Sequence, residues 1–383
     1  MGFPIVRTDF DFKIIISSLA SSVTKNENLV SNFEESLSLL TNKKYAVFFP
    51  KLRFGMEATF RALFENQVIG VPTYTCSVVP HSVALSGNRV QFFDSNANNL
   101  STEIFPRDLD SYIVTPWYGS PLNSDLDHVK YSFGDFSHVN LFAQSDVNKN
   151  NFYATFYSFS SGKPLSSIGG GIVSTDDEVL YKNLINLRNK KFNNNVSFAQ
   201  AGDIAFSLLG SFIDILNLEN IKIAFDDKGY LDSLREPINE ISLGKFPKKL
   251  SAFQIEMLIR NIEAKEDNQL KILNFWKDTL EIFPIKVLNS QNWSNSHLNI
   301  KADERNSLQK IFQKLGIQAS TGVKYLNHQL SPYGSVDGST SFKNSINHLN
   351  NLLQLPINLS DRNFLKLSKN RERIQHKVGR LYL

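Results

Sequence analysis

The chain has 383 residues, of which 42% are hydrophobic and 20% are charged, and this composition excludes a disordered protein. The net charge of +4 comes from 41 basic and 37 acidic residues, a balance too even to indicate nucleic-acid binding. The single cysteine, Cys76, excludes an intrachain disulfide and favours a reducing compartment, so we expect a cytoplasmic protein.

The first two thirds of the chain alternate helical patterns with short apolar runs. In chain order they predict a helix over 28–42, a strand over 45–50, a helix over 54–66, strands over 90–95, 112–117 and 131–136, and apolar runs over 152–159 and 170–175. Apolar runs separated by helices predict an α/β fold with a mostly parallel sheet that helices cover. In such sheets ligands bind at the carboxyl ends of the strands.

The last third differs in pattern. Residues 251–283 form a long amphipathic helical stretch, followed by a strand over 296–301, a helix over 304–316 and a closing helix over 361–378. We therefore expect a large domain, 1–245, and a smaller C-terminal α+β domain, 246–383. The most apolar run, 204–218, contains Asp214 and is shorter than the roughly 20 residues that span a bilayer, so no transmembrane segment is predicted.

One lysine, Lys163, lies among small residues in the segment YSFSSGKPLSSIGGGIVSTDD. A phosphate-binding P-loop is excluded, because Tyr157 replaces its first glycine and Pro164 its Ser or Thr. Two interpretations remain. Lys163 is an exposed loop lysine, or it forms a Schiff base with a carbonyl compound or with pyridoxal phosphate.

Pyridoxal phosphate needs a carboxylate beside its pyridine nitrogen and donors for its phosphate. Asp135 ends a predicted strand and is a candidate for the first role, although a turn carboxylate is common there. Ser158 and Arg53 are candidates for the phosphate: Ser158 ends a predicted strand and Arg53 precedes a predicted helix. Ser158 could instead cap a turn.

Several segments, in order, resemble the DegT/DnrJ family of sugar aminotransferases, which have the aspartate-aminotransferase type of fold. They are NFEESLSLLTNKKYAV, VPTYTCSVVPHSVALSGNRVQFFD, YGSPLN, GDFSHV, YSFSSGKPLSSIGGGIVSTDDEVL and SAFQIEML. The resemblance covers nearly the whole chain. It implies pyridoxal 5'-phosphate as cofactor, a nucleotide-linked keto-sugar and an amino-acid donor, typically glutamate, as substrates, and a homodimer.

The resemblance also assigns roles to single residues. Lys163 matches the Schiff-base lysine, Asp135 the partner of the pyridinium nitrogen, and Ser158 a phosphate ligand. His138 matches the residue that approaches the 3-oxygen of the cofactor, although a packed polar residue is the alternative. One branch of the family has histidine in place of this lysine and dehydrates sugars. Because this chain has Lys163 there, the resemblance favours aminotransfer.

The chain departs from the family's pattern at three places. Leu52 and Arg53 replace the glycine and threonine before the first helix, and Cys76 replaces the aromatic residue that often covers the pyridine ring. Pro247 replaces an asparagine that the family contributes from the partner subunit, and Lys249 replaces the arginine of the same motif. These changes leave a second hypothesis open: a non-catalytic member of the fold, or a sugar dehydratase.

Two histidines lie in segments that resemble the family's C-terminal, substrate-side region. His297 and His328 are candidates for substrate contact, and a structural role is the alternative. The seven histidines show no HExxH or Cys/His spacing, so no metal site is predicted.

Overall fold

The computed structural model describes most of the chain, and every structural statement below refers to those residues. They are 12–23, 28–98, 100–101, 109–120, 122, 126, 129–141, 151–160, 163–165, 167–192, 250–263, 268–288, 297–330, 333, 341–357, 359 and 361–382. Pro247, Lys249, the apolar run 204–218 and the predicted boundary at residues 245/246 lie outside them. None of the described helices has the length and apolarity that a bilayer crossing requires.

The centre of the fold is a seven-stranded sheet in the order β1-β7-β6-β5-β4-β2-β3. Its strands are β1 (Tyr45–Phe49), β2 (Val68–Pro72), β3 (Arg89–Phe93), β4 (Ser111–Val114), β5 (Tyr131–Asp135), β6 (Ala154–Ser158) and β7 (Gly171–Thr175). The pairs from β3 through β2, β4 and β5 to β6 are parallel, whereas β7 is antiparallel to both β1 and β6. The predicted α/β class with a mostly parallel sheet is confirmed, and β2 is a strand that the sequence patterns did not single out.

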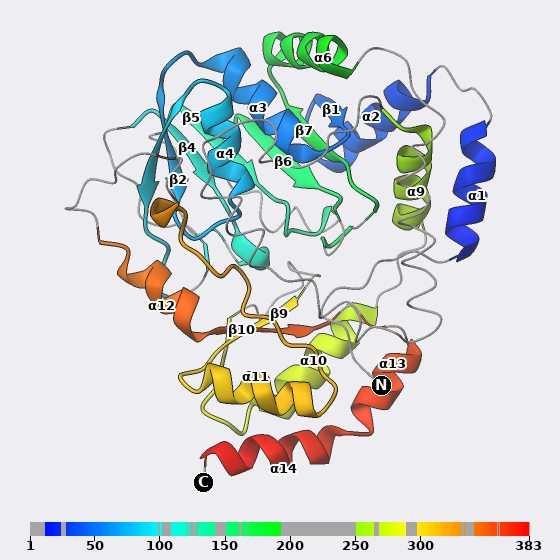
Figure 1. The fold of residues 1–383 in the computed structure, drawn as a ribbon. Helices are drawn as coiled ribbons and strands as arrows, with labels where there is room; N and C mark the ends of the chain where they lie inside the picture. Colours follow the sequence, from blue (N-terminus) through cyan, green and yellow to red (C-terminus); the bar gives the residue numbers. More distant parts are fainter. Residues whose placement is uncertain are drawn as a thin grey trace.

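Helices cover both faces of this sheet (Figure 1). On one face α3 (Leu52–Leu63), α4 (Val78–Leu85) and α6 (Glu178–Phe192) pack against a cluster that includes Val47, Phe49 and Val173. On the other face α2 (Leu29–Leu40) and α9 (Ala252–Glu263) pack against a cluster that includes Phe48 and Ile172. Successive residues of β1 and β7 thus enter opposite cores, which explains why these strands are apolar without alternation.

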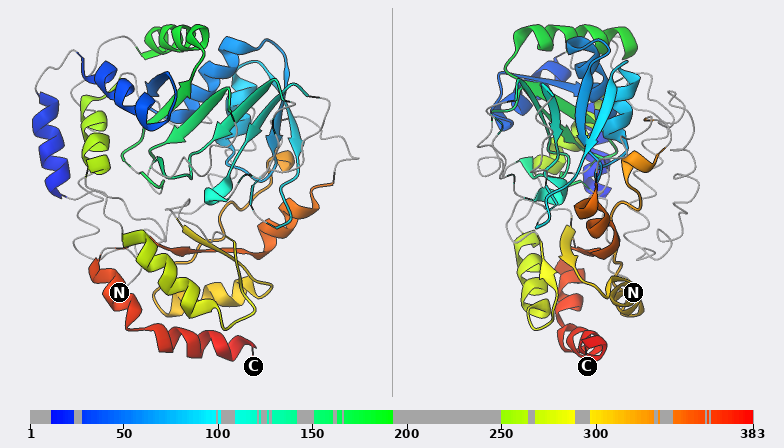
Figure 2. Two further views of the ribbon diagram at one scale, coloured as in Figure 1. Left: turned by 180° about the vertical axis from the view of Figure 1, so that it is seen from behind. Right: turned by 90° about the vertical axis from the view of Figure 1, so that its left-hand side faces the viewer.

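A second, three-stranded antiparallel sheet lies below the first in Figure 1, in the order β10-β9-β8. Its strands are β8 (Lys286–Val287), β9 (His297–Lys301) and β10 (Leu352–Pro356). Four helices share its apolar cluster, which includes Trp276, Ile300 and Phe312: α10 (Asn268–Leu280), α11 (Arg305–Lys314), α13 (Asp361–Ser368) and α14 (Arg371–Tyr382). Figure 2 shows the same two layers from behind and from the side.

The closing helix predicted over 361–378 is two helices. α13 ends at Ser368 and α14 begins at Arg371, with a turn of two residues between them. In this turn the Asn370 backbone N–H bonds to Leu367 O at 2.9 Å, and Asn370 O accepts from the Ile374 N–H of α14 at 2.9 Å. The single-helix prediction was wrong because both helices direct apolar residues into one cluster, as Leu367 and Ile374 do, so the apolar pattern runs on across the turn.

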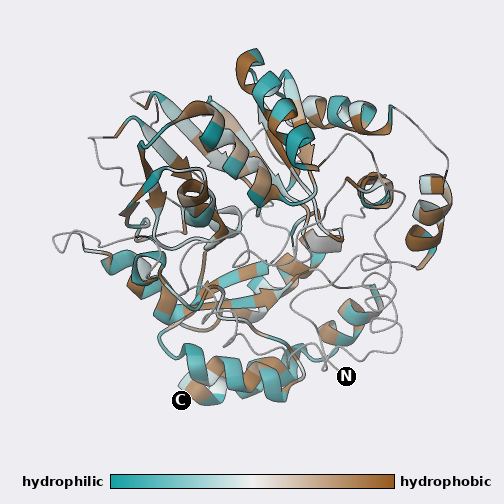
Figure 3. Cartoon of the chain, turned by 45° about the horizontal axis from the view of Figure 1, so that its top comes forward, coloured by the Kyte–Doolittle hydropathy of each residue, from teal (hydrophilic) through white to brown (hydrophobic). Residues whose placement is uncertain are grey.

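Two further helices lie at the sides of the molecule. α1 (Phe12–Val23) packs on α9, and α9 also contacts α2, so the segment that begins at Leu250 lies against the seven-stranded layer. α12 (Lys343–Asn351) runs from the end of β3 to β10, where the Asp94 carboxylate accepts hydrogen bonds from the backbone N–H groups of Asn344 and Ser345 at 2.9 and 2.8 Å. The hydropathy colouring of Figure 3 shows brown, apolar stretches on the inward sides of the helices around the sheet.

Candidate functional site

A cavity of about 230 Å³ lies at the carboxyl ends of the parallel strands, as expected for this architecture. It brings together five of the predicted residues: Arg53, Cys76, Asp135, Ser158 and Lys163. The other described residues that line it are Lys51, Leu52, Met56, Val78, Val79, Trp117, Ser137 and Ser160. The turn after β4, drawn in cyan in Figure 1, lies on the side of the sheet that faces the C-terminal layer.

Lys163 is close to a second predicted residue, His138. The Lys163 Nζ lies 2.7 Å from His138 Nε2, and the backbone N–H of Lys163 donates to Ser160 O at 3.1 Å. Burial lowers the pKa of Lys163. Electrostatic interactions with Cys76 and Asp135 act in the opposite direction. Burial, and then the charge of Lys163, hold the pKa of His138 well below its usual range. A neutral imidazole therefore faces an amine that loses its proton more readily than an exposed lysine does.

Asp135 is the last residue of β5 and is 3% exposed. Its Oδ1 accepts hydrogen bonds from the Ser137 hydroxyl at 2.5 Å and from the Ser137 backbone N–H at 3.2 Å. Burial raises the pKa of Asp135, and the Ser137 hydrogen bonds and the charge of Lys163 oppose that rise. A buried carboxylate is stabilised by any ligand that places an N–H⁺ against it.

Several residues that line the cavity are donors for an anion. Lys51 precedes α3 and Arg53 lies in its first turn, where the helix dipole also favours negative charge. Ser158 ends β6, Ser160 lies two residues beyond it, and their hydroxyls are 3.2 Å apart. The lining of the cavity thus combines a carboxylate and Lys163 with two further cations and several hydroxyls.

The two candidate histidines of the C-terminal region are in different places. His297 begins β9 and is 6% exposed, its ring centroid lies 6.1 Å from that of Tyr118, and burial with the charge of Lys163 lowers its pKa to about 3. His328 instead pairs its Nδ1 with the Thr73 hydroxyl at 2.6 Å and stacks on Phe342. The structure therefore brings His297 toward Lys163 and leaves His328 outside the lining of the cavity.

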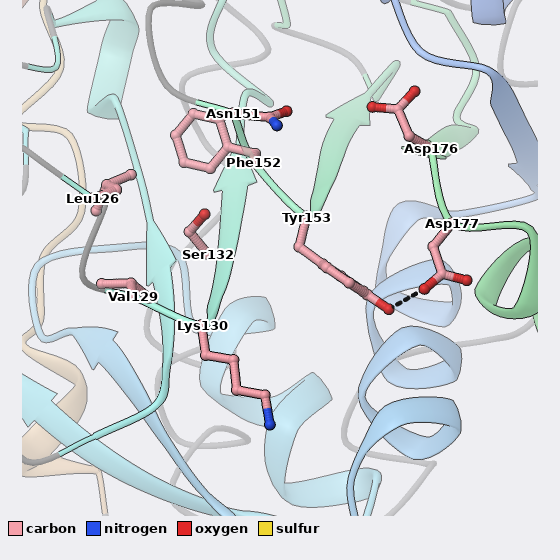
Figure 4. A pocket seen from close by; sticks show the side chains of 9 residues that line it. All are labelled: Leu126, Val129, Lys130, Ser132, Asn151, Phe152, Tyr153, Asp176 and Asp177. Carbon is pink, nitrogen blue, oxygen red and sulfur yellow. Dashed lines mark hydrogen bonds between the residues drawn. The ribbon is translucent and has the colours of Figure 1, made fainter.

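A larger cavity, of about 450 Å³, lies at the other edge of the sheet, where β5 and β6 begin and β7 ends (Figure 4). Its carboxylates serve the fold. Asp176 accepts from Lys43 Nζ at 2.8 Å and from the Lys44 backbone N–H at 2.9 Å. Asp177 accepts from the Tyr153 hydroxyl and from the backbone N–H of Leu180, where α6 begins. This cavity contains none of the predicted residues.

The sequence patterns did not identify several residues of the smaller cavity. Ser137 donates a hydrogen bond to the Asp135 carboxylate and stands between Asp135 and His138 in the sequence. That position could have identified it as a residue of the site. Trp117 lies three residues after the end of β4, at a carboxyl end where ligand contacts are expected. Lys51 and Ser160 each lie two residues from a predicted ligand. Among the described residues no group of three or more histidines, cysteines or acidic residues is placed to hold a metal ion.

Comparison with known proteins shows the fold. No protein-family model matches the sequence. No curated protein matches it either.

Many solved structures, however, are similar. A DegT/DnrJ/EryC1/StrS aminotransferase from Brucella abortus is 14% identical with a TM-score of 0.66, over 97% of this chain and 95% of that one. The Helicobacter pylori aminotransferase of pseudoaminic acid biosynthesis is 14% identical with a TM-score of 0.70, over 99% of each chain. The E. coli GDP-4-keto-6-deoxy-D-mannose-3-dehydratase, solved with hydrated pyridoxal phosphate, is 15% identical with a TM-score of 0.70, over 98% and 99%. Over nearly its whole length, this chain has the fold of the DegT/DnrJ sugar aminotransferases and of the sugar dehydratase related to them.

Proposed function

We propose that the chain is a pyridoxal-phosphate-dependent aminotransferase that converts a keto-sugar, attached to a nucleotide, into an aminosugar. The observation that carries this proposal is the group at the carboxyl ends of the strands. A lysine of lowered pKa lies 2.7 Å from a neutral histidine, in a cavity that also contains a buried carboxylate. Surface lysines do not have these neighbours.

The residues that line the cavity have the chemistry that pyridoxal phosphate requires. Asp135, buried and with a raised pKa, would pair with the pyridinium nitrogen, and Lys163 would bond to the aldehyde carbon. Arg53, Lys51 and the two serines would hold the phosphate at the start of α3. Bound in this way, the cofactor supplies an electron sink for the carbon that loses its proton.

Lys163 would act both as nucleophile and as proton carrier. Its lowered pKa raises the fraction of free amine near neutral pH, which is the form that attacks an aldehyde and accepts a proton. His138 Nε2 lies within hydrogen-bond distance of the same nitrogen and holds it at this place in the cavity. Asp135 would keep the pyridine nitrogen protonated, because a carboxylate in a buried site is stabilised by that charge.

The substrates are proposed from the similar structures. One of these enzymes is named for a GDP-linked keto-sugar and another for the biosynthesis of pseudoaminic acid. For this chain we propose a nucleotide-linked keto-sugar as amino acceptor, glutamate as donor, and a product used in polysaccharide or glycoconjugate biosynthesis. A homodimer in the cytoplasm belongs to the same proposal, and so do the domain division at residues 245/246 and the substrate contact of His297 and His328.

Two alternatives have a specific basis. A sugar dehydratase has the same fold at a TM-score of 0.70, and product analysis separates it from an aminotransferase. A non-catalytic protein is favoured by the unusual start of α3, where Leu52 lines the cavity in place of glycine. Cofactor binding separates that alternative from both enzymes.

The experiment is a titration of the purified protein with pyridoxal phosphate, followed by glutamate and then by candidate nucleotide-linked keto-sugars. We expect a visible absorbance band on cofactor addition, its loss with glutamate, and its return when the matching keto-sugar accepts the amine. Loss of a hydroxyl from the sugar, without gain of an amine, would identify a dehydratase. No band at saturating cofactor would contradict both enzymes.

A further inference from the structure

The cofactor cavity contains one aromatic side chain among the described residues that line it, and this is Trp117. A pyridine ring held edge-on by Asp135 and Lys163 needs contacts on its flat faces, and an indole offers the largest such surface. Cys76, which lines the same cavity, is too small to cover a ring. We propose that Trp117 forms the aromatic wall of this cavity and stacks on the cofactor ring. This inference rests on the proposed function.

The sheet order places Trp117 between the other residues of the cavity. β4 pairs with β5 on one side and with β2 on the other. Asp135 ends β5, and Cys76 lies in the segment that follows β2. Trp117 follows β4, the strand between these two, and lines the same cavity as Asp135 and Cys76.

The indole is fixed before any ligand arrives. It is 3% exposed, and its ring centroid lies 4.4 Å from that of Tyr118, 4.6 Å from that of His138 and 6.4 Å from that of Tyr74. The turn that carries it is also constrained, because Tyr118 and Gly119 have φ angles of 54° and 77°. A rigid aromatic surface costs little conformational entropy when a ring packs on it.

The same side chain contacts the partner of the reactive lysine. Trp117 packs against the edge of His138 at an interplanar angle of 70°, and His138 Nε2 lies 2.7 Å from Lys163 Nζ. Trp117 is thus a positioning residue as well as a wall. Its removal should weaken ring binding and should also free the imidazole.

The test measures ligand binding and not turnover. The ligands are pyridoxal phosphate and 4'-deoxypyridoxine phosphate, which lacks the aldehyde and so cannot bond to Lys163. Dissociation constants come from calorimetry of the apo full-length protein and of its variants Trp117→Leu and Trp117→Phe. The control is Trp276→Phe, because Trp276 lies in the C-terminal cluster and donates its Nε1–H to Pro356 O, away from the cavity.

We expect Trp117→Leu to weaken binding of the deoxy ligand by about 3- to 10-fold, as a lost aromatic pair does. Trp117→Phe, which keeps an aromatic face, should stay within about 2-fold, and Trp276→Phe should match the wild type. Unchanged affinity in a folded Trp117→Leu protein would overturn the stacking role of Trp117 and leave the proposed function standing. A wild type that binds neither ligand overturns both.

Fluorescence keeps the proposal falsifiable if Trp117→Leu does not fold. Contact with the ligand ring quenches the nearest indole most, so saturating ligand should quench a larger fraction of the emission in the wild type than in Trp117→Phe. Equal fractions in the two proteins would overturn the proposal.

Discussion

At the scale of single residues, the cavity is defined by groups whose charge is costly there. Burial lowers the pKa of Lys163, His138 and His297 and raises that of Asp135, so every one of them is pushed toward its neutral form. Such groups cost stability in an empty site and are stabilised by a ligand of complementary charge. The proposed cofactor supplies both a pyridinium for Asp135 and a covalent bond for Lys163.

His297 gives a pH prediction. Its folded pKa is about 3 and its unfolded value about 6.5, so the unfolded chain gains a proton as the pH falls below 6.5 while the folded protein does not. Stability is therefore lost on acidification. Between pH 7 and pH 5 the loss due to His297 is about 2 kcal/mol. In urea unfolding of the apo protein, the free energy of unfolding should fall by about 2 kcal/mol less in His297→Gln than in the wild type over this pH range. An equal fall in the two proteins would contradict the burial of His297.

The residues of the site differ in how far sequence could predict them. Lys163, Asp135 and Ser158 are strand-end or loop residues in recognisable segments, and they line one cavity. Trp117 was missed because its role depends on strand order: nothing local shows that β4 lies between β5 and β2. His328 was a candidate because its segment resembles the family's substrate-side region. Its contacts with Thr73 and Phe342 join residues far apart in the sequence and cannot be inferred from spacing.

At the scale of elements, the start of α3 is positioned by β7. Gly171 approaches Leu52 so closely that an added Cβ would lie 2.5 Å from Leu52 Cβ and 2.8 Å from its backbone nitrogen. Gly170, with φ of 101°, precedes it and bridges to Lys51. The glycines of this segment therefore let the start of α3 lie against the sheet.

Gly171→Ala should displace the start of α3, because the added carbon meets backbone and not a flexible side chain. We expect a lower melting temperature and weaker binding of pyridoxal phosphate, measured by thermal unfolding and calorimetry. The matched control is Gly379→Ala in α14, where the added Cβ would lie 3.6 Å from its nearest contact, Phe283. That change should be neutral or slightly stabilising in a helix. Equal effects of the two substitutions would contradict the steric account.

A buried ion pair ties α2, α6 and β1 together. The Glu34 carboxylate accepts from the Arg188 guanidinium and from the Phe48 backbone N–H, and Arg188 also donates to Phe48 O. Both side chains are at most 10% exposed, and burial raises the pKa of Glu34 against the effect of Arg188. The pair is therefore costly to break from one side.

Arg188→Met leaves Glu34 buried without its cation, and we expect a loss of about 3–5 kcal/mol in the free energy of unfolding. The double variant Glu34→Leu/Arg188→Met removes both charges and should recover a large part of that loss. Urea unfolding at pH 7 measures both. A double variant as unstable as the single one would show that packing, and not the unpaired charge, is responsible.

Element boundaries show where sequence patterns fail. The helical stretch 251–283 is two helices, α9 and α10, and they pack in different layers, α9 on α1 and α2 and α10 in the C-terminal cluster. Both have apolar faces of the same period, so periodicity alone joins them. β7 was predicted as a strand, but its antiparallel direction depends on pairing with β1 and β6, which the local sequence does not encode.

At the scale of the whole molecule, the C-terminal layer is attached to the sheet by polar contacts at strand ends. The Asp94 carboxylate, after β3, binds the first backbone N–H groups of α12, and the Asn327 side chain donates to the backbone oxygens of Thr73 and Thr75. His297 enters the region of Lys163 from that layer. The attachment therefore also positions part of the candidate site.

Asp94→Ala removes the acceptor for two backbone N–H groups of α12 and for the Ser345 hydroxyl. We expect faster hydrogen exchange in α12 and β10, with unchanged exchange in β5 and β6, and a loss of about 1–2 kcal/mol in stability. Hydrogen exchange read by mass spectrometry checks this, with Asp361→Ala at the start of α13 as a comparison. Uniformly faster exchange would contradict a local attachment.

The central claim is that Lys163 holds the cofactor, and chemical trapping tests it most directly. The protein is incubated with pyridoxal phosphate, reduced with borohydride, digested, and mapped by mass spectrometry, with Lys163→Arg as the control. The account predicts one modified peptide, with the phosphopyridoxyl group on Lys163, and none in the variant. Modification of other lysines at the same level in both proteins would contradict it.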